Sequence, residues 1–312
     1  MSVSPVAPMR PGPSHLKFTQ LGVIGCGLIG GSFALAMKHA GLVERVVGYS
    51  KSPSTTEKAK RLGIIDIAAE SALLAVSGSD LVLLAVPVSA TESTLKAIRD
   101  LIKPDVLVMD VGSTKRDVVD AARRVLRKQL GNFVPAHPIA GKELAGIDHA
   151  DGALFAGRHV ILTPLPQTHP DLLQRATDLW AATGAQVLRM SPEHHDAAFA
   201  AVSHLPHLLG FAYMNGLLQQ AAGRDYLTLA GPGFRDFTRI AASDPTVWRD
   251  VMLSNREELL KQSLRFKQSL EALERVLLDN NPDALEALIR QASLARGSWQ
   301  IGSSSRSAPP KN

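Results

Sequence analysis

A glycine-rich segment near the start of the chain restricts the possible folds more than any other feature. LGVIGCGLIGGSFALAMKHAG places Gly25, Gly27 and Gly30 in the pattern G-x-G-x-x-G, between an apolar run and a helix-like stretch. In this pattern the first glycine permits a tight turn, the second lets a pyrophosphate approach the backbone, and the third lets the helix pack on the strand. The anion then binds at the helix N-terminus. Residues 20–50 are therefore predicted to form the first βαβ unit of a Rossmann fold.

Beyond this unit, short apolar runs alternate with stretches of helical periodicity. We predict strands near 20–24, 45–49, 80–86, 106–110, 132–135, 159–162 and 185–188, and helices near 28–40, 53–62, 89–102, 114–129 and 169–183. Runs such as LVLLAV and VLVMDV are apolar throughout, as strands covered on both faces are. The pattern predicts an α/β domain with a doubly wound, mainly parallel sheet.

After about residue 190 the sequence predicts helices only. Ser191 and Pro192 form a helix start, with the serine as N-cap and the proline at the first helical position. One long helix is expected to reach about residue 221, a second to run from about 244 to 279, and a third to begin at Asn281-Pro282 and end near 296. Their apolar stripes predict an all-α C-terminal domain that packs across a homodimer interface.

The expected domain limits follow from these changes of character. We predict a disordered tail over 1–17, the Rossmann domain over 18–190, the helical substrate and dimerisation domain over 191–297, and a second disordered tail over 298–312. Both tails are rich in proline, serine and glycine.

Charge and composition exclude several classes of protein. The net charge is +5, and residues 1–17 and 296–312 together carry five basic residues and no acid, so residues 18–295 are neutral and nucleic-acid binding is not expected. No run approaches the roughly 18 apolar residues of a membrane span. The one cysteine, Cys26, excludes an internal disulfide, no Cys/His spacing indicates a metal site, and a reducing cytoplasmic location is expected.

The end of the second predicted strand bears on the choice of cofactor. Sites that prefer NAD place Asp or Glu about 20 residues beyond the loop, where it binds the ribose 2′-hydroxyl. Here Ser50, Lys51 and Ser52 occupy that place, which favours the 2′-phosphate of NADP, leaves NAD possible, and is also compatible with a plain surface turn. The predicted cofactor-binding residues are Gly25, Gly27, Leu28, Ile29, Gly30, Ser50, Lys51, Ser52, Val86 and Pro87.

Four further motifs follow in order along the chain. They are VGSTK (111–115), HPIAGKELAG (137–146), SHLPH (203–207) and GPGFRDFTRIAASDPTVW (231–248). Together with the glycine loop they resemble the prephenate/arogenate (cyclohexadienyl) dehydrogenases of tyrosine biosynthesis, over about residues 20–296. The resemblance implies oxidative decarboxylation of prephenate to 4-hydroxyphenylpyruvate, or of arogenate to tyrosine. Hydride leaves ring C4 for NAD(P), the C4 hydroxyl loses its proton, and the C1 carboxylate leaves as CO2.

The catalytic residues that the resemblance implies are His137 and Ser113. His137 follows a predicted strand end, and an imidazole near neutral pKa suits a base that accepts the hydroxyl proton. Ser113 matches the serine that orients the substrate hydroxyl and this base, although a serine before a helix is also a common N-cap.

The implied substrate-binding residues lie in the helical region. Ser203, His204 and His207 share one helical face, beside a bend expected at Pro206. By resemblance His207 contacts the substrate and Ser203 lies next to it, whereas His204 is equally compatible with a structural role. Arg239 matches the family's carboxylate-binding arginine.

Arg235, four residues earlier on the same predicted helix face, is a second basic candidate, possible also as a surface ion pair with Asp236. Lys142 stands where relatives often have threonine, while Glu143 is retained, and Pro232 interrupts a glycine-rich turn. Both departures lie near the expected side-chain pocket and leave the preference for prephenate or arogenate open.

Two other functions are compatible with part of the sequence. A β-hydroxyacid dehydrogenase would share the fold but use a lysine base where this chain has SHLPH. A non-catalytic dinucleotide sensor would keep the glycine loop without needing Ser113, His137, His207 and Arg239 together.

Overall fold

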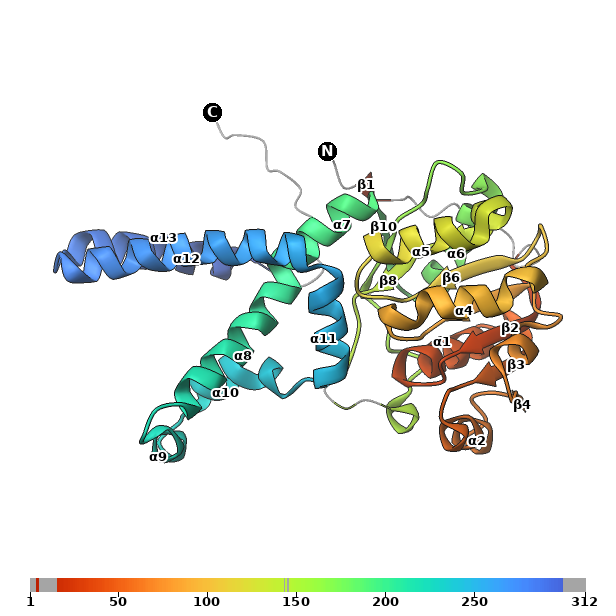
Figure 1. Cartoon of the computed structure of the whole chain (residues 1–312), viewed down its shortest axis with the longest axis horizontal. Helices are drawn as coiled ribbons and strands as arrows, with labels where there is room; N and C mark the ends of the chain where they lie inside the picture. The colour runs from red at the N-terminus through yellow and green to blue at the C-terminus, as the bar shows by residue number, and fades with distance from the viewer. Residues whose placement is uncertain (1–3, 6–15, 143, 145, 300–312) are drawn as a thin grey trace. The chain divides into compact units, whose positions relative to one another are not determined.

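A six-stranded parallel sheet forms the centre of the nucleotide-binding part (Figure 1). The computed structural model describes residues 4–5, 16–142, 144 and 146–299. The strand order is β4-β3-β2-β5-β6-β7, with β2 (Phe18–Ile24), β3 (Val43–Tyr49), β4 (Ile67–Ala68), β5 (Leu81–Leu84), β6 (Leu107–Asp110) and β7 (Phe133–Val134). The connecting helices are α1 (Leu28–His39), α2 (Pro53–Arg61), α3 (Ala72–Val76), α4 (Thr91–Ile98) and α5 (Arg116–Leu126). The predicted doubly wound sheet is confirmed.

Strand β5 shows why the central strands are apolar at every position. Leu81 and Leu83 belong to the hydrophobic cluster on one face of the sheet, and Val82 and Leu84 belong to the cluster on the other. Since side chains alternate across a strand, a strand covered on both faces needs apolar residues throughout.

The last strands form a separate second sheet, which the sequence did not predict. Its order is β1-β10-β9-β8, with β1 (Ser4–Pro5), β10 (Gln186–Arg189), β9 (His159–Leu162) and β8 (Ala136–Pro138). Strand β8 is antiparallel to β9, and helix α6 (Pro170–Ala182) connects β9 to its parallel neighbour β10. Pro135 alone separates β7 from β8, so His137 follows the end of β7, as expected, and lies within the short strand β8.

Helices make up the chain from Pro192 onward. They are α7 (Pro192–Phe199), α8 (Leu205–Leu218), α9 (Gly223–Thr228), α10 (Pro232–Thr238), α11 (Pro245–Ser254), α12 (Arg256–Leu278) and α13 (Pro282–Ser298). The predicted cap at Ser191 is confirmed, since its side chain accepts a hydrogen bond from the backbone N–H of His194. The helix predicted to begin at Asn281-Pro282 is also capped, by the side chain of Asn281, which accepts from the N–H of Ala284. A π-helical turn, Ala200–His204, joins α7 to α8, just before Pro206.

Two predicted helices of this region differ in detail from the structure, and two further helices were not predicted. The first helix ends at Leu218, and α9 and α10 were not predicted. The helix expected over 244–279 is divided at Asn255, whose backbone leaves the helical conformation while its side chain donates to the carbonyl oxygen of Asp196. This contact spans 59 residues of sequence, so no local pattern could indicate it.

Backbone packing divides the chain into two compact units, Met1–Leu259 and Leu260–Asn312. The division lies beyond the change of composition at residue 190, because α7 packs on α5 and α11 packs on the 3-10 turn Val88–Ala90. Within the tail expected over 1–17, Ser4–Pro5 pair with β10 and Leu16 is buried. Residues 1–3, 6–15 and 300–312 of the two tails lie outside the described residues.

Among the described residues, the helical segment Pro192–Leu218 is long and apolar enough to cross a membrane by length and composition alone, and 22% of its most apolar stretch is buried. The same helix carries the buried polar side chains of His195, Asp196 and His204, which bond to other elements of the protein. Its exposed apolar side chains include Val202 and Tyr213.

Candidate active site

The glycines of the nucleotide loop differ in what a side chain would meet. Gly25 has φ +101°, and a Cβ there would lie 2.1 Å from the carbonyl oxygen of Ala85. A Cβ on Gly30 would lie 2.0 Å from the carbonyl oxygen of Gly25, whereas a Cβ on Gly27 would meet no atom within 4 Å. Gly27 is also the N-cap of α1 and offers no side chain to the free N–H groups there. Open space beside uncapped N–H groups fits the pyrophosphate of a dinucleotide.

At the end of β3, the predicted 2′-phosphate side of the site carries no carboxylate. The hydroxyl of Ser50 accepts a hydrogen bond from the N–H of Cys26 at 2.8 Å, which ties it to the glycine loop. Lys51 and Ser52 are exposed, and Ser52 is the N-cap of α2 without a side-chain capping bond. Burial raises the pKa of the Cys26 thiol to about 11, so this cysteine is a packing residue and not a nucleophile.

The loop after β5 contacts the helical region. Val86 and Pro87 lead into the turn Val88–Ala90, where the hydroxyl of Ser89 donates to Oδ2 of Asp250 on α11 at 2.5 Å. Since this loop borders the nucleotide in a Rossmann fold, the contact connects the cofactor side to α11.

His137 is part of a buried hydrogen-bonded chain. Its Nδ1 lies 2.8 Å from Nε2 of His195, and Nδ1 of His195 lies 2.7 Å from Oδ1 of Asp196. His195 and Asp196 are fully buried and His137 nearly so. The Phe199 ring stacks on His195 and packs against His137. We call His137–His195–Asp196 the imidazole–carboxylate chain.

The carboxylate end of this chain caps helix α5. Asp196 accepts hydrogen bonds from the backbone N–H groups of Lys115 at 2.8 Å and Arg116 at 2.9 Å, so an acid from α7 supplies the cap that α5 lacks locally. The buried side chain of Lys115 donates to Asp110 at 2.5 Å and to the carbonyl oxygen of Ala136 at 2.6 Å. The loop that carries Ser113 is thereby fixed to β8, one residue before His137.

Burial keeps these imidazoles uncharged. It lowers the pKa of His137 well below 6.5, with His195 and the Lys115 cation adding to the effect. It lowers the pKa of His195 to about 2 and that of His204 to about 4. Burial raises the pKa of Asp196, and the N–H groups of Arg116 and Lys115 oppose that rise. At neutral pH the histidines are therefore bases rather than cations.

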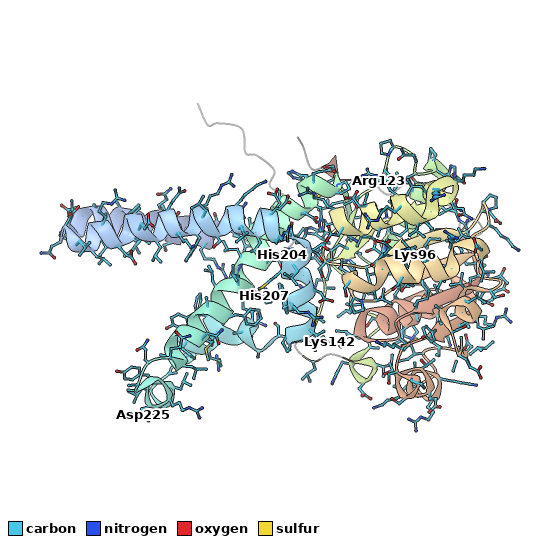
Figure 2. All side chains as sticks on the ribbon, viewed as in Figure 1. Lys96, Arg123, Lys142, His204, His207 and Asp225 are labelled. Atoms are coloured by element: carbon cyan, nitrogen blue, oxygen red, sulfur yellow. The ribbon has the colours of Figure 1, made fainter. Side chains whose placement is uncertain are left out.

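The predicted SHLPH residues lie on the π-helical turn and the first residues of α8. Figure 2 shows His204 and His207 on the same helical segment. His207 stacks on Trp248 of α11 with ring centroids 3.4 Å apart, and its Nδ1–H donates to the carbonyl oxygen of Ser203. Nδ1 of His204 accepts from the amide of Asn255 at 3.1 Å, while its Nε2 is buried with no partner among the described residues.

The predicted cationic residues are placed differently from one another. Arg239 begins the turn after α10 and is exposed. Burial lowers the pKa of His207, and the Arg239 cation adds to that effect. Arg235 forms the exposed ion pair with Asp236 that was the alternative to substrate binding. Lys142 pairs with Asp151 at 3.2 Å. Glu143 lies outside the described residues.

Sequence reasoning missed His195, Asp196, Asn255 and Trp248. His194-His195-Asp196 is visible in the sequence, but at a helix start it reads as an ordinary polar turn. Only the docking of α7 on α5 turns two of these residues inward.

Comparisons with known proteins agree with the geometry. The nucleotide-binding domain of prephenate dehydrogenase matches residues 33–189, and its dimerization domain matches residues 191–291. The chain is 35% identical to prephenate dehydrogenase of Bacillus subtilis, covering 91% of this chain and 76% of the relative. It is 34% identical to cyclohexadienyl dehydrogenase of Zymomonas mobilis, covering 89% and 95%.

Solved structures give the same result. Prephenate dehydrogenase of Aquifex aeolicus, in complex with hydroxyphenyl propionate and NAD+, superposes with a TM-score of 0.85 at 35% identity, covering 90% of this chain and 98% of that one. A 3-hydroxyisobutyrate dehydrogenase from Salmonella typhimurium, at 16% identity and a TM-score of 0.54, shares the fold alone. The chain belongs to the prephenate dehydrogenase family, the NAD(P)-dependent oxidoreductases that carry out the oxidative decarboxylation of prephenate or arogenate in tyrosine biosynthesis.

Proposed function

We propose that this enzyme uses His137 as the base for prephenate, with NADP as its preferred cofactor. The observation that carries the assignment is a buried, uncharged imidazole where the second sheet meets helix α7. Its neighbours come from both the nucleotide-binding and the helical part, as expected for a group between cofactor and substrate.

The reaction balances without net release of a proton. When bound, the nicotinamide cofactor would supply the acceptor for the hydride of ring C4, while the C4 hydroxyl gives its proton to Nε2 of His137. The C1–carboxylate bond breaks, and its electron pair enters the ring, which becomes a phenolate as CO2 leaves. His137 returns the proton to the same oxygen, so a base enclosed in the protein needs no exit path for it. The lowered pKa of His137 favours this return, because the imidazolium is the less stable form.

The proposed roles of the other site residues follow from their charge and position. Ser113, next to the Lys115 anchor, orients the C4 hydroxyl. Arg239 binds a substrate carboxylate, as a guanidinium does in two-point contact. His207 and Ser203 contact the side-chain end, with His207 held in place by the Trp248 ring. Arg235, Glu143 and Lys142 complete the predicted pocket. The ion pairs of Arg235 and Lys142 would have to open for that role.

The preference for NADP rests on the end of β3. Ser50, Lys51 and Ser52 offer hydroxyls and one cation beside the uncapped N-terminus of α2, and no acid that would repel a 2′-phosphate. A turnover ratio that favours NAD over NADP would contradict this preference.

We also propose a cytoplasmic homodimer formed through the C-terminal helices. Large apolar side chains remain exposed on α12, among them Leu260, Leu264 and Leu277. A monomeric mass in sedimentation at micromolar concentration would refute the dimer.

The test is a comparison of rates with two substrates and two cofactors. Purified protein is mixed with prephenate or arogenate and with NADP or NAD, while reduced cofactor and aromatic product are measured. We expect the highest kcat/KM with prephenate and NADP. Turnover in none of the four mixtures would refute the function.

His137→Asn tests the base. We expect kcat to fall by about 10²–10⁴-fold, the usual contribution of a general base, with cofactor affinity unchanged. His194→Gln is the control, because this exposed histidine lies on the same helix as His195 but outside the chain of hydrogen bonds. A His137→Asn enzyme of normal kcat would exclude His137 as the base.

A further inference from the structure

We propose that His195 and Asp196 are positioning residues that hold His137 in the tautomer with hydrogen on Nδ1 and a free lone pair on Nε2. The proposal rests on the proposed role of His137 as the base and names the residues that prepare it. It follows from the order of donors and acceptors along the imidazole–carboxylate chain.

The order is fixed at the Asp196 end. Oδ1 accepts from the N–H of Lys115 and Oδ2 accepts from the N–H of Arg116. Both oxygens of Asp196 therefore face backbone donors whose orientation is fixed. Both N–H groups open helix α5, whose dipole also favours a negative charge at this point. The carboxylate therefore acts as an acceptor toward His195, and Nδ1 of His195 carries the hydrogen.

The positions of the hydrogens on His195 and His137 then follow. A neutral imidazole has one donor and one acceptor nitrogen, so Nε2 of His195 is an acceptor. It lies 2.8 Å from Nδ1 of His137, which must donate. Nε2 of His137 is then left with the lone pair that a base for the substrate hydroxyl requires.

The surroundings prevent the two rings from turning. The Phe199 ring stacks on His195 with centroids 4.4 Å apart and packs against His137 at 4.9 Å. The amide of Asn255 donates to the backbone carbonyl oxygen of Asp196 at 2.8 Å, which holds this turn of α7 from the opposite side. Flipping either ring would break a buried hydrogen bond.

The chain also supports His137 during the reaction. When Nε2 has taken the proton, His137 is a cation in a buried site, and its Nδ1–H points along His195 toward the carboxylate. The same arrangement stabilises the imidazolium in serine proteases, where an Asp→Asn change that spoils the tautomer lowers kcat about 10⁴-fold. No proton needs to reach Asp196 for this to work.

Three variants separate positioning from packing. His195→Gln keeps a carbonyl oxygen that can accept from Nδ1–H of His137, and His195→Leu keeps the volume without an acceptor. His194→Gln is the matched control on the exposed side of the same helix. Each full-length protein is measured for kcat, for KM of prephenate, for Kd of the cofactor, and for imidazole ¹⁵N shifts in protein labelled on histidine.

We expect kcat to fall by about 10²–10⁴-fold in His195→Leu and by about tenfold or less in His195→Gln, with cofactor Kd within about twofold in both. The ¹⁵N shifts of His137 should show protonated Nδ1 and unprotonated Nε2 in the wild type and in His195→Gln. In His195→Leu the population of the His137 tautomer with hydrogen on Nε2 should increase.

Two results would overturn the proposal: equal kcat losses in His195→Leu and His195→Gln, or a wild-type His137 with hydrogen on Nε2. The ¹⁵N spectrum needs no turnover. Wild-type protein that shows the predicted tautomer but turns over neither substrate would therefore refute the proposed function alone. An active enzyme unaffected by His195→Leu would refute the positioning role alone.

Discussion

Single residues of the glycine loop serve different purposes. Gly25 and Gly30 are glycine because the protein's own backbone occupies the space of a side chain. Gly27 has no such neighbour, which leaves a ligand as the reason for its missing side chain. The pattern G-x-G-x-x-G predicts all three positions, but only the structure distinguishes the two kinds of constraint.

Gly27→Ala should therefore separate binding from folding. We expect the Kd of the cofactor to rise about tenfold or more, equivalent to about 1.4 kcal/mol, because the new methyl group occupies the path of the pyrophosphate. The free energy of unfolding without cofactor should change by less than about 1 kcal/mol. Isothermal titration and urea unfolding measure the two quantities.

Gly25→Ala is the matched comparison. Its positive φ and the 2.1 Å approach to Ala85 predict a loss of about 2 kcal/mol or more in the free energy of unfolding. If both variants lost stability equally, the distinction between the two glycines would be wrong.

At the scale of elements, the functional site depends on where helices stop. The π-helical turn Ala200–His204 joins α7 to α8 directly before His207, and π-turns are frequent at functional sites. The break at Asn255 ends α11, and Trp248 of α11 stacks against His207. The sequence predicts that these helices exist, from periodicity and caps, but it does not predict their interruptions.

Asn255→Ala should show how much the side chain at this break contributes to the free energy of unfolding. The change leaves the carbonyl oxygen of Asp196 and Nδ1 of His204 buried without the amide donor. We expect the free energy of unfolding to fall by about 1–3 kcal/mol, because Nδ1 of His204 becomes an unpaired buried acceptor, whereas the carbonyl oxygen of Asp196 keeps its hydrogen bond from the N–H of Ala200. Urea unfolding at pH 7.5 measures the loss. A loss below about 0.5 kcal/mol, the range of neutral surface changes, would mean that the amide is dispensable.

At the scale of the whole molecule, buried histidines make folding stability depend on pH. The pKa of His137, His195 and His204 is lower in the folded protein than the ordinary 6.5. As pH falls below about 6.5 the unfolded chain binds protons that the folded protein does not, so stability decreases. The decrease continues toward the folded values, about 4 for His204 and about 2 for His195.

Between pH 7 and pH 5, His195 and His204 should each remove about 2 kcal/mol from the free energy of unfolding, and the lowered pKa of His137 acts in the same direction. Asp196, whose pKa burial raises, offsets part of this loss by binding a proton in the folded protein. His195→Gln should reduce the decrease by about 2 kcal/mol, and His194→Gln should leave it unchanged. Urea unfolding at both pH values tests this. Equal stability of the wild type at pH 7 and pH 5 would show that these histidines are not neutral in the folded state.

The sequence alone determined the features that local chemistry controls. The glycine loop, the apolar central strands and the caps at Ser191 and Asn281 depend on residues a few positions apart, and all were predictable. The separate second sheet and the imidazole–carboxylate chain were decided by the tertiary structure. His137 meets His195 across 58 residues, and Asp196 meets Lys115 across 81. Such contacts exist only once α7 docks on α5, because burial then excludes the water that would otherwise satisfy each polar group.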